Sequence, residues 1–177
     1  MAKNGVIIDL GCGDGLITNF IAMMEPKRLI YGIEFNSTRI QEAKRGLKNA
    51  KFKQGNILKE NFPSADMILL IHVLHHLSSY EEQSTLIKKC KDKLKKDGKL
   101  IIVEIDRRPI LKFILTWIVD TIIFSILFEK KLFNFNIFYR SKDKWKSYLE
   151  YSGFKVKTIS AHQNKPFSHL ILYCKKI

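Results

Sequence analysis

Short apolar runs alternate with segments of helical periodicity along most of the chain. Five runs have the length and composition of strands, and they cover residues 5–10, 29–34, 51–54, 66–71 and 99–104. The run at 66–71 is continuously apolar after its first residue, which is typical of a strand buried on both sides. Strands that alternate with helices predict a parallel sheet with helices on both of its faces.

Helical patterns occupy the intervals between these runs. The first three helices are expected at residues 15–24, 37–48 and 80–96. Asn36 or Ser37 caps the second of them, and the Asp97-Gly98 pair ends the third. These helices supply the crossover connections that parallel strands require.

The end of the chain has a different pattern. A helix is expected at 141–152, and Gly153 ends it. Strand-like runs follow at 154–159 and 169–174. The connection between them, which contains Asn164-Lys165-Pro166, is too short to hold a crossover helix. The last two strands should therefore pair antiparallel.

The most apolar stretch, at residues 110–128, lies inside a segment at 107–140 that separates the fifth strand from the last helix. Lys112, Thr116 and Asp120 recur every four residues and form a narrow polar stripe on an apolar helix. Charged side chains are costly in lipid, so a membrane-spanning helix is disfavoured. We expect a lid over the active site, and the alternative is a helix that rests on a membrane surface.

Composition indicates one globular domain over residues 1–177. Hydrophobic residues make up 46% of the chain and charged residues 27%, as in ordinary folded domains. Cys12, Cys90 and Cys174 are far apart and show no CxxC spacing, which argues against a disulfide framework or a structural zinc site. No signal peptide is visible, and a cytoplasmic location is expected.

The chain is strongly basic. It has 31 lysine and arginine residues and 17 aspartate and glutamate residues, which gives a net charge of +14. A field of that sign attracts nucleic acid, anionic lipid or acidic substrates. The positive charge is spread along the chain and is densest at residues 88–99, which favours solvated lysines over a dedicated anionic partner.

A glycine-rich loop follows the first strand and opens the first helix. Its spacing is D-x-G-x-G-x-G over residues 9–15, and Leu16 stands where a dinucleotide-binding GxGxxG loop would need glycine. No Walker GK[ST] sequence is present either. Glu34 ends the second strand, where a carboxylate can accept hydrogen bonds from both ribose hydroxyls of a nucleoside. Together the two features predict an adenosine-containing ligand.

These segments resemble the ordered motifs of class I S-adenosylmethionine-dependent methyltransferases. The matching segments are residues 6–15 for the glycine motif, 31–36 for the acidic motif, 54–57 for the adenine loop, 65–77 for the fourth motif and 94–104 for the run into the fifth strand. The fourth segment is similar to that of small-molecule methyltransferases, including the quinone-biosynthesis type. The resemblance implies a doubly wound, Rossmann-like α/β fold with a mostly parallel seven-stranded sheet of order 3-2-1-4-5-7-6, the last strand antiparallel, and helices on both faces.

The resemblance also implies which residues hold the cofactor, S-adenosylmethionine. Gly11, Gly13 and Gly15 would lie along its methionine portion, with Cys12 in the same loop. Asp9 would hold the ammonium group. Glu34 would hold the ribose, with Phe35 beside it, whereas Asn56 and Ile57 would face the adenine. His72 would form part of the pocket wall. Asn56 stands where the family often has aspartate, and an amide can still accept one hydrogen bond.

Methyl transfer from a sulfonium is an in-line displacement, and a base is needed only when the acceptor must lose a proton. His75 and His76 follow the fourth strand and are the candidate bases, with helix capping or packing as the alternative. His72 and His76 lack the carboxylate partner of a metal site, so no metal is expected. Asp106 is expected to border the acceptor, and His169 is interpreted as structural.

The predicted function is methylation of a small, hydrophobic or lipid-like acceptor, with peripheral membrane contact through 110–128. One alternative is a non-catalytic relative that binds S-adenosylmethionine. A nucleic-acid methyltransferase is less favoured, because the fourth strand ends in Ile71-His72-Val73-Leu74 instead of an Asn/Asp-Pro-Pro-aromatic or Pro-Cys motif. Only residues 1–4 precede the first strand, where relatives usually carry one or two helices, so a truncated chain or another covering element is expected.

Overall fold

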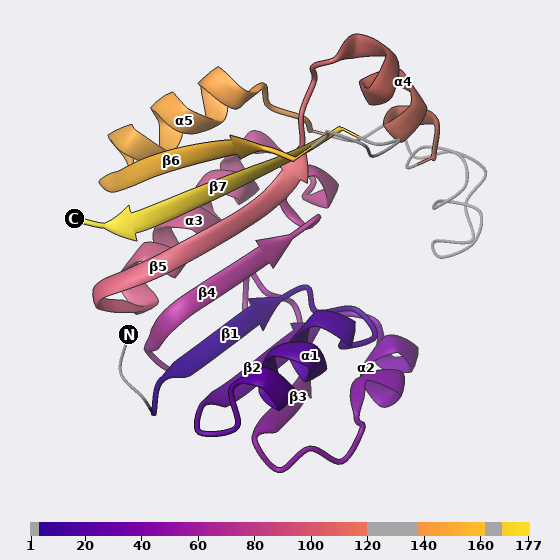
Figure 1. The fold of residues 1–177 in the computed structure, drawn as a ribbon, viewed down its shortest axis with the longest axis vertical. Coiled ribbons are helices and arrows are strands. Elements are labelled where there is room, and N and C mark those ends of the chain that lie inside the picture. Colours follow the sequence, from indigo (N-terminus) through magenta and orange to yellow (C-terminus); the bar gives the residue numbers. More distant parts are fainter. Residues whose placement is uncertain (1–3, 120–137, 162–167) are drawn as a thin grey trace.

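In the computed structural model, which describes residues 4–119, 138–161 and 168–177, seven strands form one sheet of order β3-β2-β1-β4-β5-β7-β6 (Figure 1). The strands are β1 (Val6–Leu10), β2 (Leu29–Glu34), β3 (Ala50–Gln54), β4 (Ala65–Ile71), β5 (Leu94–Ile105), β6 (Phe154–Ser160) and β7 (His169–Lys176). All pairs are parallel except those of β7, which runs antiparallel to both β5 and β6. The predicted fold class and strand order are confirmed.

Helices lie on both faces of this sheet. They are α1 (Leu16–Met24), α2 (Ser37–Ala43), the short 3-10 helix η1 (Leu74–His76), α3 (Tyr80–Lys93), α4 (Ile110–Ile118) and α5 (Lys142–Tyr151). In Figure 1, α1 lies in front of the sheet, α3 lies behind it, α5 lies alongside β6, and α4 rises beyond the carboxyl ends of the parallel strands.

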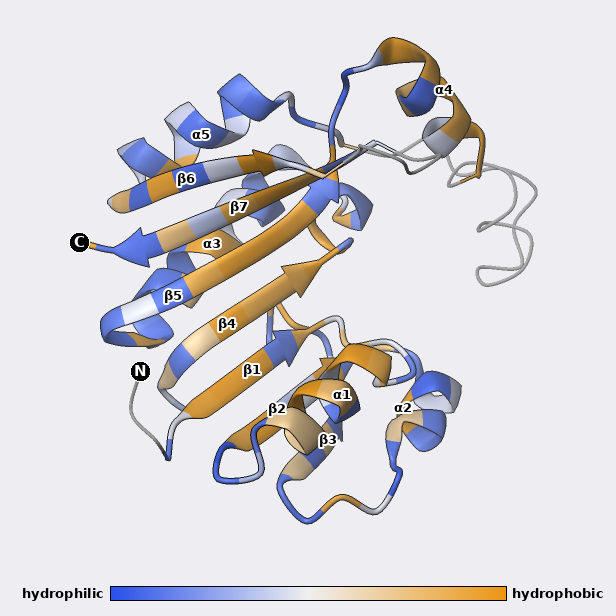
Figure 2. Cartoon of the chain, viewed as in Figure 1, coloured by the Kyte–Doolittle hydropathy of each residue, from blue (hydrophilic) through white to orange (hydrophobic). Residues whose placement is uncertain are grey.

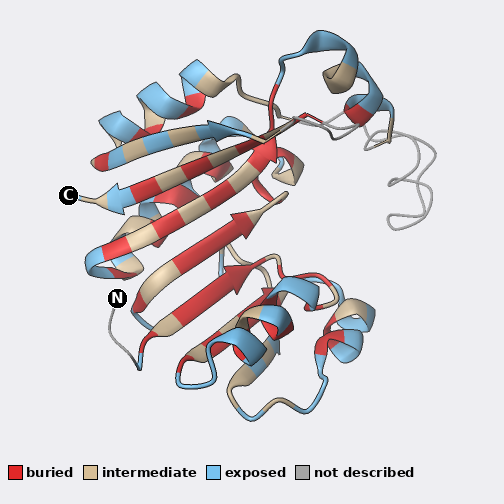
Figure 3. Ribbon diagram, in the orientation of Figure 1, coloured by how far each residue is buried: buried red, intermediate tan, exposed pale blue. Residues whose placement is uncertain are grey.

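Two apolar clusters hold the layers together. The larger one joins the sheet to α3 and α5 through Leu86, Ile87, Trp145 and Leu149, all of them buried. The smaller one joins α1 to the opposite face of the sheet through Ala22. The central strands β1 and β4 are accordingly the most continuously buried, as their red colour shows (Figure 3). Loops that leave their carboxyl ends are therefore anchored to a rigid layer.

Two helix boundaries differ from the sequence prediction. The second helix ends at Ala43 instead of residue 48, and Gly46 beyond it has a left-handed φ of 77°. The third helix ends at Lys93, because Leu94 already pairs with Ala65 as the first residue of β5 and is buried there. In both places a tertiary contact or a turn interrupts a periodicity that continues in the sequence.

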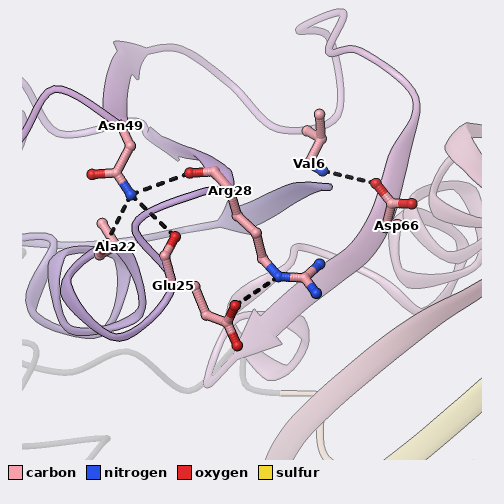
Figure 4. Close-up of polar contacts among 6 residues, drawn as sticks. All are labelled: Val6, Ala22, Glu25, Arg28, Asn49 and Asp66. Atoms are coloured by element: carbon pink, nitrogen blue, oxygen red, sulfur yellow. Dashed lines mark hydrogen bonds and ion pairs between the residues drawn. The ribbon is translucent and has the colours of Figure 1, made fainter. Parts of the chain in front are cut away.

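The amino ends of the parallel strands are tied together by side chains (Figure 4). The Asn49 amide, just before β3, donates hydrogen bonds of 2.8–3.3 Å to three backbone carbonyls, those of Ala22, Glu25 and Arg28. The Arg28 Nε donates to Glu25 at 2.9 Å. The Val6 amide at the start of β1 donates to Asp66 in β4 at 2.8 Å. These contacts, which we call the amino-edge brace, fix the edge of the sheet opposite to the glycine loop.

Within the described residues, no helix is both long enough and apolar enough to cross a bilayer. Of the apolar stretch at 110–128, residues 110–118 form α4. Residues 120–128, with Asp120, lie outside the described residues, as do Asn164-Lys165-Pro166 in the connection between β6 and β7.

Candidate functional site

A cavity of about 830 Å³ lies at the carboxyl ends of β1, β2 and β4. Its walls include every site residue expected from the sequence except Gly15 and Asp106. These residues are Asp9, Gly11, Cys12, Gly13, Glu34, Phe35, Asn56, Ile57, His72, His75 and His76. In a doubly wound sheet this edge is where ligands bind.

The three glycines of the loop have different structural roles. Gly11 and Gly13 face the cavity, and their φ angles of 76° and 56° lie in the left-handed region that favours glycine. Gly15 is instead the residue before α1, packed behind the loop. A Cβ atom there would lie 2.7 Å from the Cβ of Ala43 and 2.9 Å from the Phe52 ring. Gly15 therefore allows close packing of the helix and does not line the cavity.

Glu34 is oriented by the backbone around it. Its Oε2 accepts a hydrogen bond from the Gly13 amide at 3.1 Å, and its Oε1 accepts one from the Asn36 amide at 2.9 Å. Each carboxylate oxygen keeps capacity for a further donor. The carboxylate is thus held in position at the cavity with acceptor sites for two hydroxyl groups, as a ribose requires.

Asp9 is buried beneath the glycine loop. Its Oδ2 accepts a hydrogen bond of 2.6 Å from the Thr18 hydroxyl. Burial raises the pKa of Asp9 to about 6, with the Thr18 hydrogen bond acting against this and the Glu34 charge adding to it. Ionisation of the Asp9 side chain is unfavourable in the folded chain alone. It becomes favourable when a cationic group binds beside the carboxylate.

Asp9→Asn is expected to stabilise the protein at neutral pH. The folded-state pKa lies above the unfolded value, so the favourable contribution of Asp9 is complete below about pH 4 and is lost as pH rises through about 6. Removing the charge should raise the free energy of unfolding by about 2–3 kcal/mol at pH 7.5, and the gain should shrink toward pH 4. Urea denaturation at several pH values measures this. Asp14→Asn, in the same loop but half exposed, is the control and should show no such gain.

His75 of η1 lines the cavity and forms a buried pair with Glu104 of β5 behind it. The Nδ1 of His75 lies 2.6 Å from the Oε2 of Glu104. The other oxygen of Glu104 accepts the Leu74 amide at 2.8 Å, and the Tyr139 ring stacks on His75 with centroids 5.3 Å apart. Burial acts to raise the pKa of Glu104, but the charge and hydrogen bond of His75 outweigh it and hold that pKa below its usual value.

Three more histidines surround this pair. Burial lowers the pKa of His72 to about 4 and that of His76 to about 3, so both are neutral at physiological pH. His72 has a φ of 54° at the end of β4, and its ring lies 5.0 Å from that of His169. Among the described residues, no three His, Cys, Asp or Glu side chains are grouped as a metal site.

Several residues that line the cavity were not among the site residues predicted from the sequence. His169, which we interpreted as structural, lines the cavity at the first residue of β7. Arg39 of α2 reaches the cavity beside Gly13, and Thr116 and Val119 reach it from the end of α4. Asp106, expected to border the acceptor, is instead buried outside the cavity lining, where it accepts the Arg108 amide at 3.3 Å.

Comparison with known proteins supports the interpretation of this edge. A family model described as a methyltransferase domain matches residues 1–153. Flavonoid 7-O-methyltransferase 1A of Mentha piperita is 33% identical over 101 residues, which cover 56% of this chain and 28% of that enzyme. The chain thus spans less than a third of this curated relative.

Solved structures share the fold. A methyltransferase from Methanosarcina mazei, described as dependent on S-adenosylmethionine, superposes with a TM-score of 0.74 at 21% identity and covers all of this chain and 94% of that one. Human N-acetylserotonin methyltransferase, solved with S-adenosylmethionine, has a TM-score of 0.72 at 20% identity over 98% of this chain and 48% of its own. The chain belongs to the methyltransferase domain family, in the class that uses S-adenosylmethionine as its cofactor.

Proposed function

We propose that this protein transfers a methyl group from S-adenosylmethionine to a hydroxyl group of a small apolar acceptor. The observation that carries the proposal is the buried His75–Glu104 pair, whose His75 lines the same cavity as Glu34 and Asp9. A base and a cofactor cradle that share one cavity are what methylation of a hydroxyl needs. The O-methyltransferase activity named for the mint relative supports the choice of hydroxyl.

The residues present fit the cofactor. Gly13 leaves the loop surface open beside Glu34, and the buried Asp9 carboxylate suits an ammonium group. Asn56 also lines the cavity and is fixed by its Oδ1, which accepts the Leu58 amide at 2.9 Å. When bound, S-adenosylmethionine supplies a methyl group that its sulfonium already activates. The protein's own task is then to align the acceptor, exclude water and receive a proton.

His75 is the residue placed to receive that proton. If its Nδ1 carries a hydrogen donated to Glu104, Nε2 is the basic nitrogen of the ring. The Glu104 carboxylate orients the imidazole and stabilises the positive charge that forms on it. His76 also lines the cavity, but its pKa of about 3 makes it a weak base at physiological pH. Of the two predicted bases, the geometry favours His75.

Apolar side chains form a substantial part of the cavity wall. They include Ile17, Ile71, Val73, Leu77, Ile105 and Val119. Such a surface favours a hydrophobic acceptor that presents one polar group toward His75. This supports an apolar hydroxyl-bearing molecule over a sugar or a nucleotide.

Calorimetric titration with S-adenosylmethionine tests the cofactor site, and release of S-adenosylhomocysteine with a panel of flavonoids tests the transfer. Micromolar binding together with turnover on at least one free hydroxyl is the expected result. Binding without turnover on any hydroxyl, amine or carbon acceptor would support the non-catalytic alternative. A folded chain that binds neither S-adenosylmethionine nor S-adenosylhomocysteine would contradict the proposal.

A further inference from the structure

The helix α4 turns its polar side toward the protein. Thr116 is buried, and its hydroxyl donates to the Lys112 carbonyl at 2.7 Å and accepts the Ser168 amide at 3.4 Å. Thr116 and Val119 also line the cavity of the candidate site. The inner side of this helix therefore packs against the domain and the cavity.

The outer side of α4 is apolar and exposed. Its six large side chains there are 37–78% exposed, and they are Ile110, Leu111, Ile114, Leu115, Trp117 and Ile118. At 100° per residue they form one stripe about 160° wide. The same helix is coloured hydrophobic in Figure 2 and mostly exposed in Figure 3. An ordinary surface helix has the reverse arrangement, so this stripe is suited to an apolar environment outside the domain.

The surface at the amino end of the stripe is positive. Arg107 and Arg108 lie just before α4, separated from it by Pro109, and are both exposed, whereas the neighbouring Asp106 is buried. A groove of about 310 Å³ opens beside the stripe, and Arg107, Tyr80, Phe113, Ile114, Trp117 and Tyr139 line it. The Arg107 guanidinium lies 5.8 Å from the centre of the Phe113 ring. An arginine in an aromatic groove next to apolar side chains fits the phosphate of a lipid headgroup.

We propose that α4 docks into the surface of an anionic bilayer, with its apolar stripe among the acyl chains and Arg107 and Arg108 at the headgroups. A nine-residue helix with this charge distribution lies in the plane of the interface. A second copy of the chain fits the stripe less well, because each copy has a net charge of +14 and repels the other, whereas anionic lipid attracts both.

Docking would define the class of acceptor, and this part rests on the proposed function. Thr116 and Val119 line the cavity from the opposite side of the docked helix. The cavity would therefore lie next to the lipid, and the acceptor would be a hydroxyl-bearing molecule dissolved in the bilayer.

Tryptophan fluorescence of the full chain gives a direct test. The chain has two tryptophans, and Trp145 is buried in the core whereas Trp117 lies on the stripe. Vesicles of phosphatidylcholine with phosphatidylserine should shift the emission to shorter wavelength, and brominated lipid should quench it. Vesicles of phosphatidylcholine alone should bind more weakly, and added salt should weaken the binding to anionic vesicles.

Matched variants locate the docking surface. Leu111→Ser combined with Ile114→Ser should lower vesicle partitioning by at least about tenfold. Phe20→Ser combined with Met23→Ser removes two similarly exposed apolar side chains from α1 and should leave partitioning unchanged. Arg107→Gln with Arg108→Gln should lower binding to anionic vesicles about fivefold per arginine and leave binding to neutral vesicles unaffected.

Equal losses in the α1 and α4 variants would overturn the assignment to α4. A wild-type chain that binds no vesicles, or that forms a dimer which the α4 variant dissociates, would overturn the membrane proposal. Calorimetric titration with S-adenosylmethionine on the same samples keeps the two proposals separate. Loss of vesicle binding with intact binding of S-adenosylmethionine would contradict the docking proposal alone. Loss of cofactor binding with intact vesicle binding would contradict the proposed function alone.

Discussion

Glu34→Ala is expected to raise the dissociation constant for S-adenosylmethionine about a hundredfold or more. The Glu34 carboxylate is held at the cavity by the amides of Gly13 and Asn36, and its remaining acceptor sites suit the two ribose hydroxyls. Hydrogen bonds to a charged group contribute about 1.5–3 kcal/mol each, so loss of two gives this factor. The substitution also leaves the two backbone amides without their carboxylate acceptor, which loosens the glycine loop. Isothermal titration calorimetry measures the change.

Glu42→Ala is the matched control for this experiment. Glu42 lies on α2, is exposed, and carries the same charge as Glu34. Its removal should change the affinity less than about twofold, since an exposed charge near water interacts weakly with a bound ligand. If the two variants lost affinity equally, Glu34 would act only through the general field of the protein, and the ribose assignment would be wrong.

His75→Ala is expected to lower kcat by about two to four orders of magnitude while leaving the affinity for S-adenosylmethionine nearly unchanged. The size follows from the usual contribution of general base catalysis. His76→Ala is the control from the same short helix, and it should lower kcat much less because that imidazole is a weak base. Single-turnover measurements with a hydroxyl acceptor from the flavonoid panel separate the methyl-transfer step from product release.

Glu104 acts through His75 and is a positioning residue. Glu104→Gln keeps a hydrogen-bond acceptor but removes the charge that stabilises protonated His75. Both kcat and the pH dependence of kcat should change, with the ascending limb of the profile moving to lower pH. A lower kcat with an unmoved pH profile would mean that Glu104 serves only the packing of the core.

The sequence predicted the cavity residues around the glycine loop better than those that later elements contribute. Asp9 and Gly13 lie at or just beyond the end of the first strand and Glu34 ends the second, so the predicted parallel sheet already places the three residues at the same end of the sheet. Glu104 and His75 are 29 residues apart, and only the pairing of β4 with β5 brings them together. A carboxylate at the end of a strand is common, so nothing in the local sequence singled out Glu104.

His169 shows a different limit. The sequence correctly predicted that β7 runs antiparallel, and this orientation places its first residue at the carboxyl end of β5, opposite Ile105. The predicted strand order and direction therefore already imply that His169 lies at the site, although the strand that contains it gives no local indication of this. The predicted ends of the second and third helices were wrong for a different reason. The turn at Gly46 and the burial of Leu94 depend on contacts that hydrophobic periodicity does not encode.

The amino-edge brace and the site occupy opposite edges of the sheet and share no residue. The strand β1 alone separates them by roughly 16 Å, and changes at such a distance usually combine additively. Acceptor preference can then diverge through substitutions around Thr116, His169 and Val119, while Asn49, Arg28 and Asp66 keep the folded state intact. Because of this separation, substitutions that change acceptor preference leave the folding stability contributed by the brace unchanged. That stability margin allows the protein to accept further substitutions.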